Sequence, residues 1–114
     1  MAITCENKNG VGLVTVTGSL NASSVESFQS QFGAWFDSQP GVKQVVMDLG
    51  GVNFIDSLGL GALISIFKRV AGRGGNMRLV HPQESVKLVL GITRTSGLLH
   101  SFDTLDEAMR DASR

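Results

Sequence analysis

The stretch from residue 53 to residue 61 reads Asn53-Phe54-Ile55-Asp56-Ser57-Leu58-Gly59-Leu60-Gly61. An apolar segment and a glycine pair lead into it, and an amphipathic helical pattern leads out of it. Ser57 stands at the expected start of that helix, where its hydroxyl could cap the free N–H groups of the first turn. A phosphate on Ser57 would instead lie at the positive end of the helix dipole. Both interpretations, a structural cap and a modification site, are open at this point.

The neighbours of Ser57 give the second interpretation some weight. Asp56 precedes it, and Gly59 and Gly61 remove side chains from the turn that follows. Leu58 and Leu60 are expected to leave apolar surface near the hydroxyl. These neighbours favour a role for Ser57 beyond that of a structural cap.

Composition limits the classes of protein to consider. The 114 residues form one domain, 1–114, with 42% hydrophobic and 18% charged residues, as in an ordinary globular protein. Ten basic and ten acidic residues cancel, so we expect no direct binding to nucleic acid. There is no signal-peptide pattern at the start, and no apolar run approaches the ~18 residues of a membrane span. The lone Cys5 excludes an intramolecular disulfide and fits a reducing compartment. We expect a cytoplasmic protein that works through partners.

The first third of the chain predicts a hairpin and a helix. Strands are expected at Ile3 to Glu6 and at Val11 to Thr17, joined by the turn pair Asn9-Gly10. Ser23 and Glu26 resemble a capping box at the start of a helix. Large apolar residues then recur in steps of three and four, and the simplest interpretation is a core-facing stripe: Val25, Phe28, Phe32, Trp35 and Phe36.

The rest of the chain alternates between strands and helices. Strands are expected at Val42 to Leu49, Asn76 to Val80 and Leu98 to Phe102. The helix from Ser57 has an apolar side and ends at Gly72-Arg73-Gly74-Gly75, which follows a helix and is therefore a turn, not a phosphate-binding loop. The next helix starts at Pro82, buries Val86, Val89, Leu90 and Thr93, and stops at Gly97; the last opens through a capping box at Thr104 and Glu107.

The expected order is β-β-α-β-α-β-α-β-α, which defines an α/β fold. We predict a mixed, mostly parallel sheet of four or five strands packed with four helices, the longer helices lying on one face. The segment between Asp48 and Ser57, a loop in this prediction, lies at the carboxyl end of a strand, where open α/β sheets place their functional sites.

Several of these segments together resemble the STAS domain family, which includes the bacterial anti-sigma factor antagonists. The signature is Phe54-Ile55-Asp56-Ser57-Leu58-Gly59-Leu60-Gly61 after an apolar strand. Further matches cover nearly the whole chain: Gly18-Ser19-Leu20-Asn21, Gly74-Gly75, Ser96-Gly97-Leu98 and Phe102-Asp103-Thr104-Leu105-Asp106-Glu107-Ala108.

The resemblance implies a phosphorylation switch with Ser57 as the phosphoacceptor. In such antagonists an anti-sigma factor that is also a serine protein kinase phosphorylates this Ser, and a metal-dependent serine phosphatase restores the free hydroxyl. The unmodified form binds the kinase and frees its sigma factor. The resemblance implies no catalytic residue, metal or cofactor, and it implies a partner-binding surface of Ser19, Asn21, Asp56, Leu58, Gly59 and Gly61. Two residues depart from the family pattern: Leu58 stands where a second Ser is common, and Asn21 where Asp is usual.

Other interpretations of the same residues remain open. A STAS domain can belong to a lipid-transport complex or to a scaffold of several STAS proteins, with Ser57 only a helix cap. A small hydrolase could pair Ser57 with His81 or His100, but the chain has no Gly-x-Ser-x-Gly elbow at Ser57. The carboxylates of Asp48, Asp56 and Asp103 match no known metal-binding loop, and Asp48 is more simply a strand-end residue that organises the loop after it.

Overall fold

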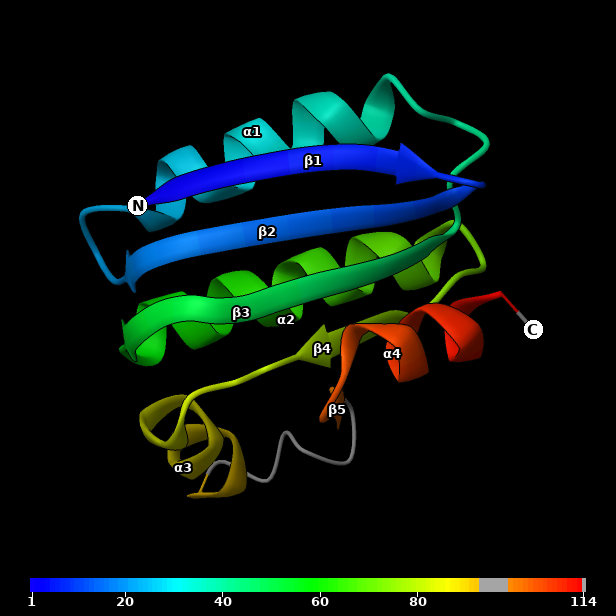
Figure 1. The fold of residues 1–114 in the computed structure, drawn as a ribbon. Coiled ribbons are helices and arrows are strands. Elements are labelled where there is room, and N and C mark those ends of the chain that lie inside the picture. The colour runs from blue at the N-terminus through cyan, green and yellow to red at the C-terminus, as the bar shows by residue number, and fades with distance from the viewer. Residues whose placement is uncertain (93–98, 114) are drawn as a thin grey trace.

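A computed structural model describes residues 1–92 and 99–113 of the chain. In it a five-stranded sheet has the order β1-β2-β3-β4-β5, as Figure 1 shows. The strands are β1 (Ala2–Lys8), β2 (Val11–Leu20), β3 (Gln44–Ile55), β4 (Met77–Val80) and β5 (His100–Phe102). The β1–β2 pair is antiparallel and the other three pairs are parallel, so the predicted mixed sheet is confirmed. Asn9 and Gly10 both have positive φ, as a tight hairpin turn requires.

The helices divide between the two faces of the sheet. They are α1 (Val25–Asp37), α2 (Ser57–Gly72), α3 (Glu84–Ile92) and α4 (Leu105–Ala112). Figure 1 shows α1 and α2 behind the sheet and α4 in front of it. One buried cluster joins residues of α1, α2 and α3 to the strands, and a smaller one joins Ala108 and Ala112 of α4 to Val11, Leu13, Val46 and Val80. The longer helices therefore share one face, as predicted.

The aromatic stripe of α1 lies in the core. Phe28, Phe32 and Phe36 are fully buried, and the rings of Phe32 and Phe36 stack with centroids 5.2 Å apart. The guanidinium of Arg73 lies 3.5 Å from the centroid of the Phe36 ring. It also donates to the carbonyls of Phe36, Gln39 and Val42, so it ties the end of α2 to the end of α1. The prediction of a core stripe is confirmed.

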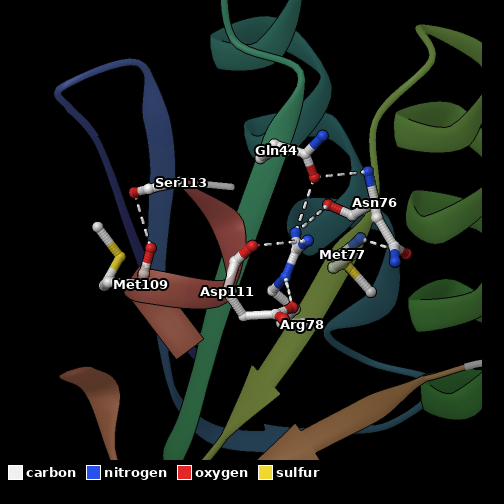
Figure 2. Close-up of polar contacts among 7 residues, drawn as sticks. All are labelled: Gln44, Asn76, Met77, Arg78, Met109, Asp111 and Ser113. Atoms are coloured by element: carbon white, nitrogen blue, oxygen red, sulfur yellow. Dashed lines mark hydrogen bonds and ion pairs between the residues drawn. The ribbon is translucent and has the colours of Figure 1, made fainter. Parts of the chain in front are cut away.

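A partly buried polar network fastens α4 to the sheet (Figure 2). Arg78 of β4 is only 8% exposed, and its Nε pairs with Asp111 Oδ2 at 2.5 Å. Arg78 Nη1 donates to Gln44 Oε1 over 2.7 Å, and the same oxygen accepts from Asn76 N over 3.0 Å. The network therefore joins β3, β4 and α4 at one place.

The structure corrects the prediction for the third strand. β3 does not end at Leu49 but continues through Gly50 and Gly51 to Ile55, so most of the expected loop is strand. The extension pairs with the end of β2, with Thr17 beside Gly51, Ser19 beside Phe54 and Leu20 beside Ile55. Register shifts on either side of Thr17 accommodate the glycines. Asp48 accordingly lies within the strand and not at its end.

The first capping prediction is wrong, and the third helix begins at Glu84 and not at Pro82 as predicted. The N-cap of α1 is Ser24, not Ser23, and its hydroxyl donates to the Ser19 carbonyl instead of accepting from the helix. Thr104 caps α4 as predicted, with its Oγ1 accepting from Glu107 N. The glycine-rich segment after α2 is a turn, in which Gly74 has φ +88°. The predicted roles of Thr93, Gly97 and Leu98 fall outside the described residues.

Candidate functional site

The junction between β3 and α2 is built around Asp56. Its backbone is extended, with φ −104° and ψ −175°, which makes it the N-cap of α2. Asp56 Oδ1 accepts from Gly59 N over 2.8 Å, and Oδ2 accepts from Ala22 N over 3.2 Å. One carboxylate therefore caps α2 and holds the β2–α1 connection against it. The cap interpretation of Ser57 is corrected, because Asp56 performs that role.

Ser57 is the first residue of α2, and it is exposed. Within the described part of the chain its hydroxyl has no hydrogen-bond partner. The first N–H groups of a helix lack partners inside the helix, so an anion on this hydroxyl would lie beside free donors at the positive helix end. The geometry leaves Ser57 available to another protein, whereas its neighbour Asp56 is engaged on both oxygens.

The two glycines of the signature differ in what surrounds them. A Cβ on Gly59 would lie 2.2 Å from the Leu20 carbonyl oxygen and 2.9 Å from Ile55 Cγ1. Glycine is therefore required there for α2 to approach the end of β2. A Cβ on Gly61 would meet nothing within 4 Å. The fold uses the first glycine and makes no steric use of the second.

The predicted partner-binding residues Ser19 and Asn21 lie on the adjoining connection. Ser19 Oγ donates to Asn53 Oδ1 over 3.2 Å, which joins the ends of β2 and β3. The Asn21 side chain accepts from Ser23 N, and its carbonyl accepts from Ser24 N and Val25 N, so Asn21 shapes the turn into α1. The Ala22–Asp56 hydrogen bond then brings this turn to the start of α2. The structure thus places Ser19, Asn21 and Asp56 around one junction.

The apolar surface at the junction is not the one expected. Leu58 is 56% exposed, as predicted, but Leu60 is 7% exposed and belongs to the core. Phe54 is 50% exposed and was missed as a surface residue. The strand extension places Phe54 beside Ser19, while the next residue, Ile55, lies beside Leu20 in the core. Burial does not alternate along this part of β3, since Asn53 and Phe54 are both exposed between the buried Val52 and Ile55, so the sequence carried no signal for the exposed Phe54.

The alternative chemistries have little support in the side-chain positions. His81 Nδ1 lies 3.3 Å from Asp48 Oδ1, so the imidazole contacts Asp48 and not Ser57. Asp48 Oδ1 also accepts from Gly50 N over 2.9 Å, which organises the glycine pair as expected of it. Among the described residues, no three His, Cys, Asp or Glu side chains converge as a metal site would need. Over the same residues, no helix is long and apolar enough to cross a bilayer.

Comparison with known proteins gives a consistent match. A family model described as the STAS domain matches residues 2–108. A Thermotoga maritima protein named as a candidate anti-sigma factor antagonist is 35% identical over 74 residues. That alignment covers 65% of this chain and 66% of the relative, just under two thirds of the relative's length.

Solved structures match over a larger share of the chain. A crystal structure of a Thermotoga maritima protein with the same description superposes with a TM-score of 0.86 at 27% identity, covering 98% of this chain and 95% of the other. The anti-sigma factor antagonist SpoIIAA in its unphosphorylated form gives a TM-score of 0.82 at 18% identity, covering 98% and 96%. At that identity the likeness shows a common fold.

Proposed function

The chain belongs to the STAS domain family, and we propose that it acts there as an anti-sigma factor antagonist. In this proposal the unphosphorylated chain binds an anti-sigma factor that is also a serine protein kinase. Phosphorylation of Ser57 ends the binding, and a metal-dependent serine phosphatase reverses the modification. The chain itself acts as a regulator in the cytoplasm and catalyses nothing. The names of the relatives described above support the class of function.

The observation that carries the proposal is that Asp56 caps the helix while the hydroxyl of Ser57 beside it is left exposed. Asp56 supplies the helix cap with Oδ1 and binds Ala22 N with Oδ2. Ser57 is exposed next to it and has no partner for its hydroxyl in the described residues. A serine that was needed only as a helix cap would occupy the capping position. Ser57 does not, so its hydroxyl is free for modification.

The size of the electrostatic change suits a switch. A phosphate adds about −1.5 to −2 charge and three acceptor oxygens. The helix end would favour it by ~0.5–2 kcal/mol, while the neighbouring Asp56 carboxylate repels it. An unpaired dianion inside a partner interface would weaken binding by several kcal/mol, because the charge loses its water and gains no partner. Each ~1.4 kcal/mol corresponds to a tenfold change in affinity. Loss of affinity on the order of a hundredfold needs no large change in conformation.

Substitutions at Ser57 test the proposal directly. Each serine-kinase anti-sigma factor encoded in the same genome would be purified, mixed with the chain and ATP, and the product weighed as intact protein. We expect Ser57→Ala to abolish phosphate uptake and to keep partner affinity within about threefold, because a small neutral side chain remains. We expect Ser57→Asp to weaken binding about tenfold or more by placing a carboxylate in the interface.

The matched control is Ser30→Ala, which changes an exposed serine of α1 and should alter neither quantity. Undiminished phosphate uptake by Ser57→Ala would exclude Ser57 as the acceptor. Recovery of transporter subunits and no kinase from the native cells would favour the lipid-transport assembly instead.

A further inference from the structure

A groove runs between the β1–β2 turn and the last turns of α4. It consists of two hollows of about 430 Å³ and 320 Å³, which share Asn9 of the turn and Ser113 at the end of α4. Met109 and Ser113 line the larger hollow, and Figure 2 shows both on the side of α4 that lies away from Arg78. Each volume falls within the ~300–1,000 Å³ that is typical of small-molecule sites. The groove lies at the amino end of β3, whereas Ser57 follows the carboxyl end.

Hydrogen bonds within the chain hold the walls of this groove in place. In the β1–β2 turn, Asn7 Oδ1 accepts from Gly10 N over 2.8 Å. Gln44, which lines the smaller hollow, accepts from Arg78 Nη1 over 2.7 Å. The pair of Arg78 with Asp111 holds α4 against the same strands. The groove is therefore largely pre-formed, as small-molecule sites usually are.

The arginine that lines the groove differs from the other described arginines, because it has no partner. Arg69 pairs with a carboxylate, Arg73 donates to three carbonyls, and Arg78 pairs with a carboxylate. Arg110 lines the larger hollow, and within residues 1–92 and 99–113 its guanidinium contacts no acceptor. Lys43 lines the smaller hollow and has no ion pair in that part of the chain either. Each hollow therefore contains a positive charge that nothing in the described chain neutralises.

The side chains around the two hollows are mostly cationic. Lys8 joins Arg110 at the larger hollow, and its contact with Glu6 is an exposed one at 3.9 Å, which contributes little. Asp106 is the one carboxylate among the described residues that line the two hollows. The cations Lys8, Lys43 and Arg110 thus exceed it, although the whole chain has a net charge of zero. A groove lined by one sign of charge concentrates ligands of the opposite sign.

We propose that this groove binds a small molecule that carries an anionic group at each end of a hydroxyl-bearing chain. Lys8 and Arg110 bind one anionic group and Lys43 binds the other, because these cations lie in different hollows. The amide of Asn9 lies where the hollows join and contacts the middle of the molecule, and Asp106 accepts from one of its hydroxyl groups. Sugar bisphosphates and hydroxylated dicarboxylates share this chemistry. The proposal is independent of the function proposed above.

Two probes of the same carbon-chain length test the proposal and distinguish the anionic groups. They are fructose bisphosphate, with phosphates on the two terminal carbons, and glucarate, with a carboxylate at each end. Each would be added to the isotope-labelled chain at physiological salt while the backbone amide signals are followed by NMR. We expect at least one probe to shift the signals of Asn9, Gly10, Arg110 and Ser113, with a Kd below about 1 mM. Inorganic phosphate, which can fill one hollow only, should bind at least about tenfold more weakly.

Substitutions that remove a charge but keep most of the side chain locate the binding. Arg110→Gln and Lys43→Gln should each weaken binding of the probe at least about fivefold. Both variants should melt within about 2 °C of the unsubstituted chain, because neither side chain has a partner to lose. The matched control is Lys68→Gln, which removes another exposed lysine without an ion pair in the described residues, on α2 and outside the groove. It should leave affinity within about twofold.

Three outcomes would overturn the proposal. Neither probe might shift the amide signals named above, or inorganic phosphate might bind as tightly as the better probe. Lys68→Gln might also weaken binding as much as Arg110→Gln does, which would show only general attraction of anions to exposed cations. Because these measurements use the chain alone, without a kinase or an anti-sigma factor, their failure would leave the proposal for Ser57 untouched.

Discussion

The two ends of β3 use polar groups for opposite purposes. At the amino end, Gln44 accepts from both Arg78 and Asn76, and Arg78 also pairs with Asp111 of α4 (Figure 2). The donors and acceptors there satisfy one another inside the chain. At the carboxyl end, Asp56 satisfies the backbone of α2 and of the β2–α1 connection, while the Ser57 hydroxyl beside it stays open to solvent.

Apolar residues follow the same division. Near the network of Arg78 and Asp111, Val46 and Val80 are fully buried beneath α4 together with Ala108. Near Ser57, both Phe54 and Leu58 keep half or more of their surface exposed. The amino end of β3 is therefore closed by contacts within the chain, and the carboxyl end leaves apolar side chains exposed. Substitutions at the two ends should accordingly affect different measurements.

The largest loss of stability is expected from Arg78→Ala. The substitution leaves Asp111 without its guanidinium partner and opens space beneath α4, so unfolding should become easier by about 2–4 kcal/mol. The melting temperature should fall by about 10 °C or more. At temperatures where the variant is folded, affinity for the anti-sigma factor should be unchanged.

The control for this prediction is Arg69→Ala, which removes an exposed pair with Asp37 at 2.9 Å. An exposed ion pair contributes below about 1 kcal/mol, so this change should be small in a denaturant titration. Equal losses of stability for the two variants would show that the pair of Arg78 and Asp111 contributes no more than an exposed ion pair.

Gly59→Ala should produce the next largest effect, and it lies at the other end of β3. The new methyl group would collide with the Leu20 carbonyl oxygen, so α2 must move away from β2. Overpacking of this kind typically destabilises a protein by about 1–3 kcal/mol, even though alanine favours a helix. The same movement displaces the start of α2 and should weaken partner binding.

Comparison with Gly61→Ala makes the prediction sharper, because the two glycines lie on the same helix. Chemical denaturation should show loss of stability for Gly59→Ala and a gain of up to about 1 kcal/mol for Gly61→Ala. The same sign for both variants would contradict the finding that Gly59 lies in close contact with β2 while Gly61 faces open space.

Local patterns in the sequence predicted most of the fold. The apolar steps of α1, the Asn9-Gly10 turn and the Thr104 cap each depend on residues close together in the chain, so the element order could be derived without the structure. The candidate site could be located for the same reason. Ser57 follows a strand and opens a helix, which the sequence alone indicates.

The errors have nonlocal causes. β3 continues past Gly50 and Gly51 because the end of β2 pairs with it, and two adjacent glycines give no sign of that pairing. The choice of Asp56 over Ser57 as the cap depends on the extended backbone of Asp56, whose N–H donates to the Leu20 carbonyl over 3.2 Å. Both features depend on contacts with the end of β2, which lies more than thirty residues away in the sequence.

The smallest expected effect concerns Cys5 on the edge strand β1. It tests whether β1 is held as firmly as the Arg78 end of β3 or is as accessible as the Ser57 end. Cys5 packs partly against the main core, and burial raises the pKa of its thiol from 9.0 to about 11. The thiol is therefore protonated in both the folded and the unfolded chain below pH 9, and burial of the neutral form favours folding fully there. Between about pH 9 and about pH 11 the unfolded chain ionises first, so this contribution to stability is lost as pH rises.

Alkylation measures the ionisation and accessibility of the Cys5 thiol at a single pH. At pH 8 the folded chain should react with iodoacetamide at least about tenfold more slowly than the chain in denaturant, because its thiolate fraction is lower and one side of the thiol is covered. Ser57→Asp and Gly61→Ala should leave the rate unchanged, because they act at the open end of α2. A native rate equal to the denatured rate would mean that β1 leaves the sheet readily. β1 would then be accessible to solvent like the Ser57 end of β3, and not held in place like the Arg78 end.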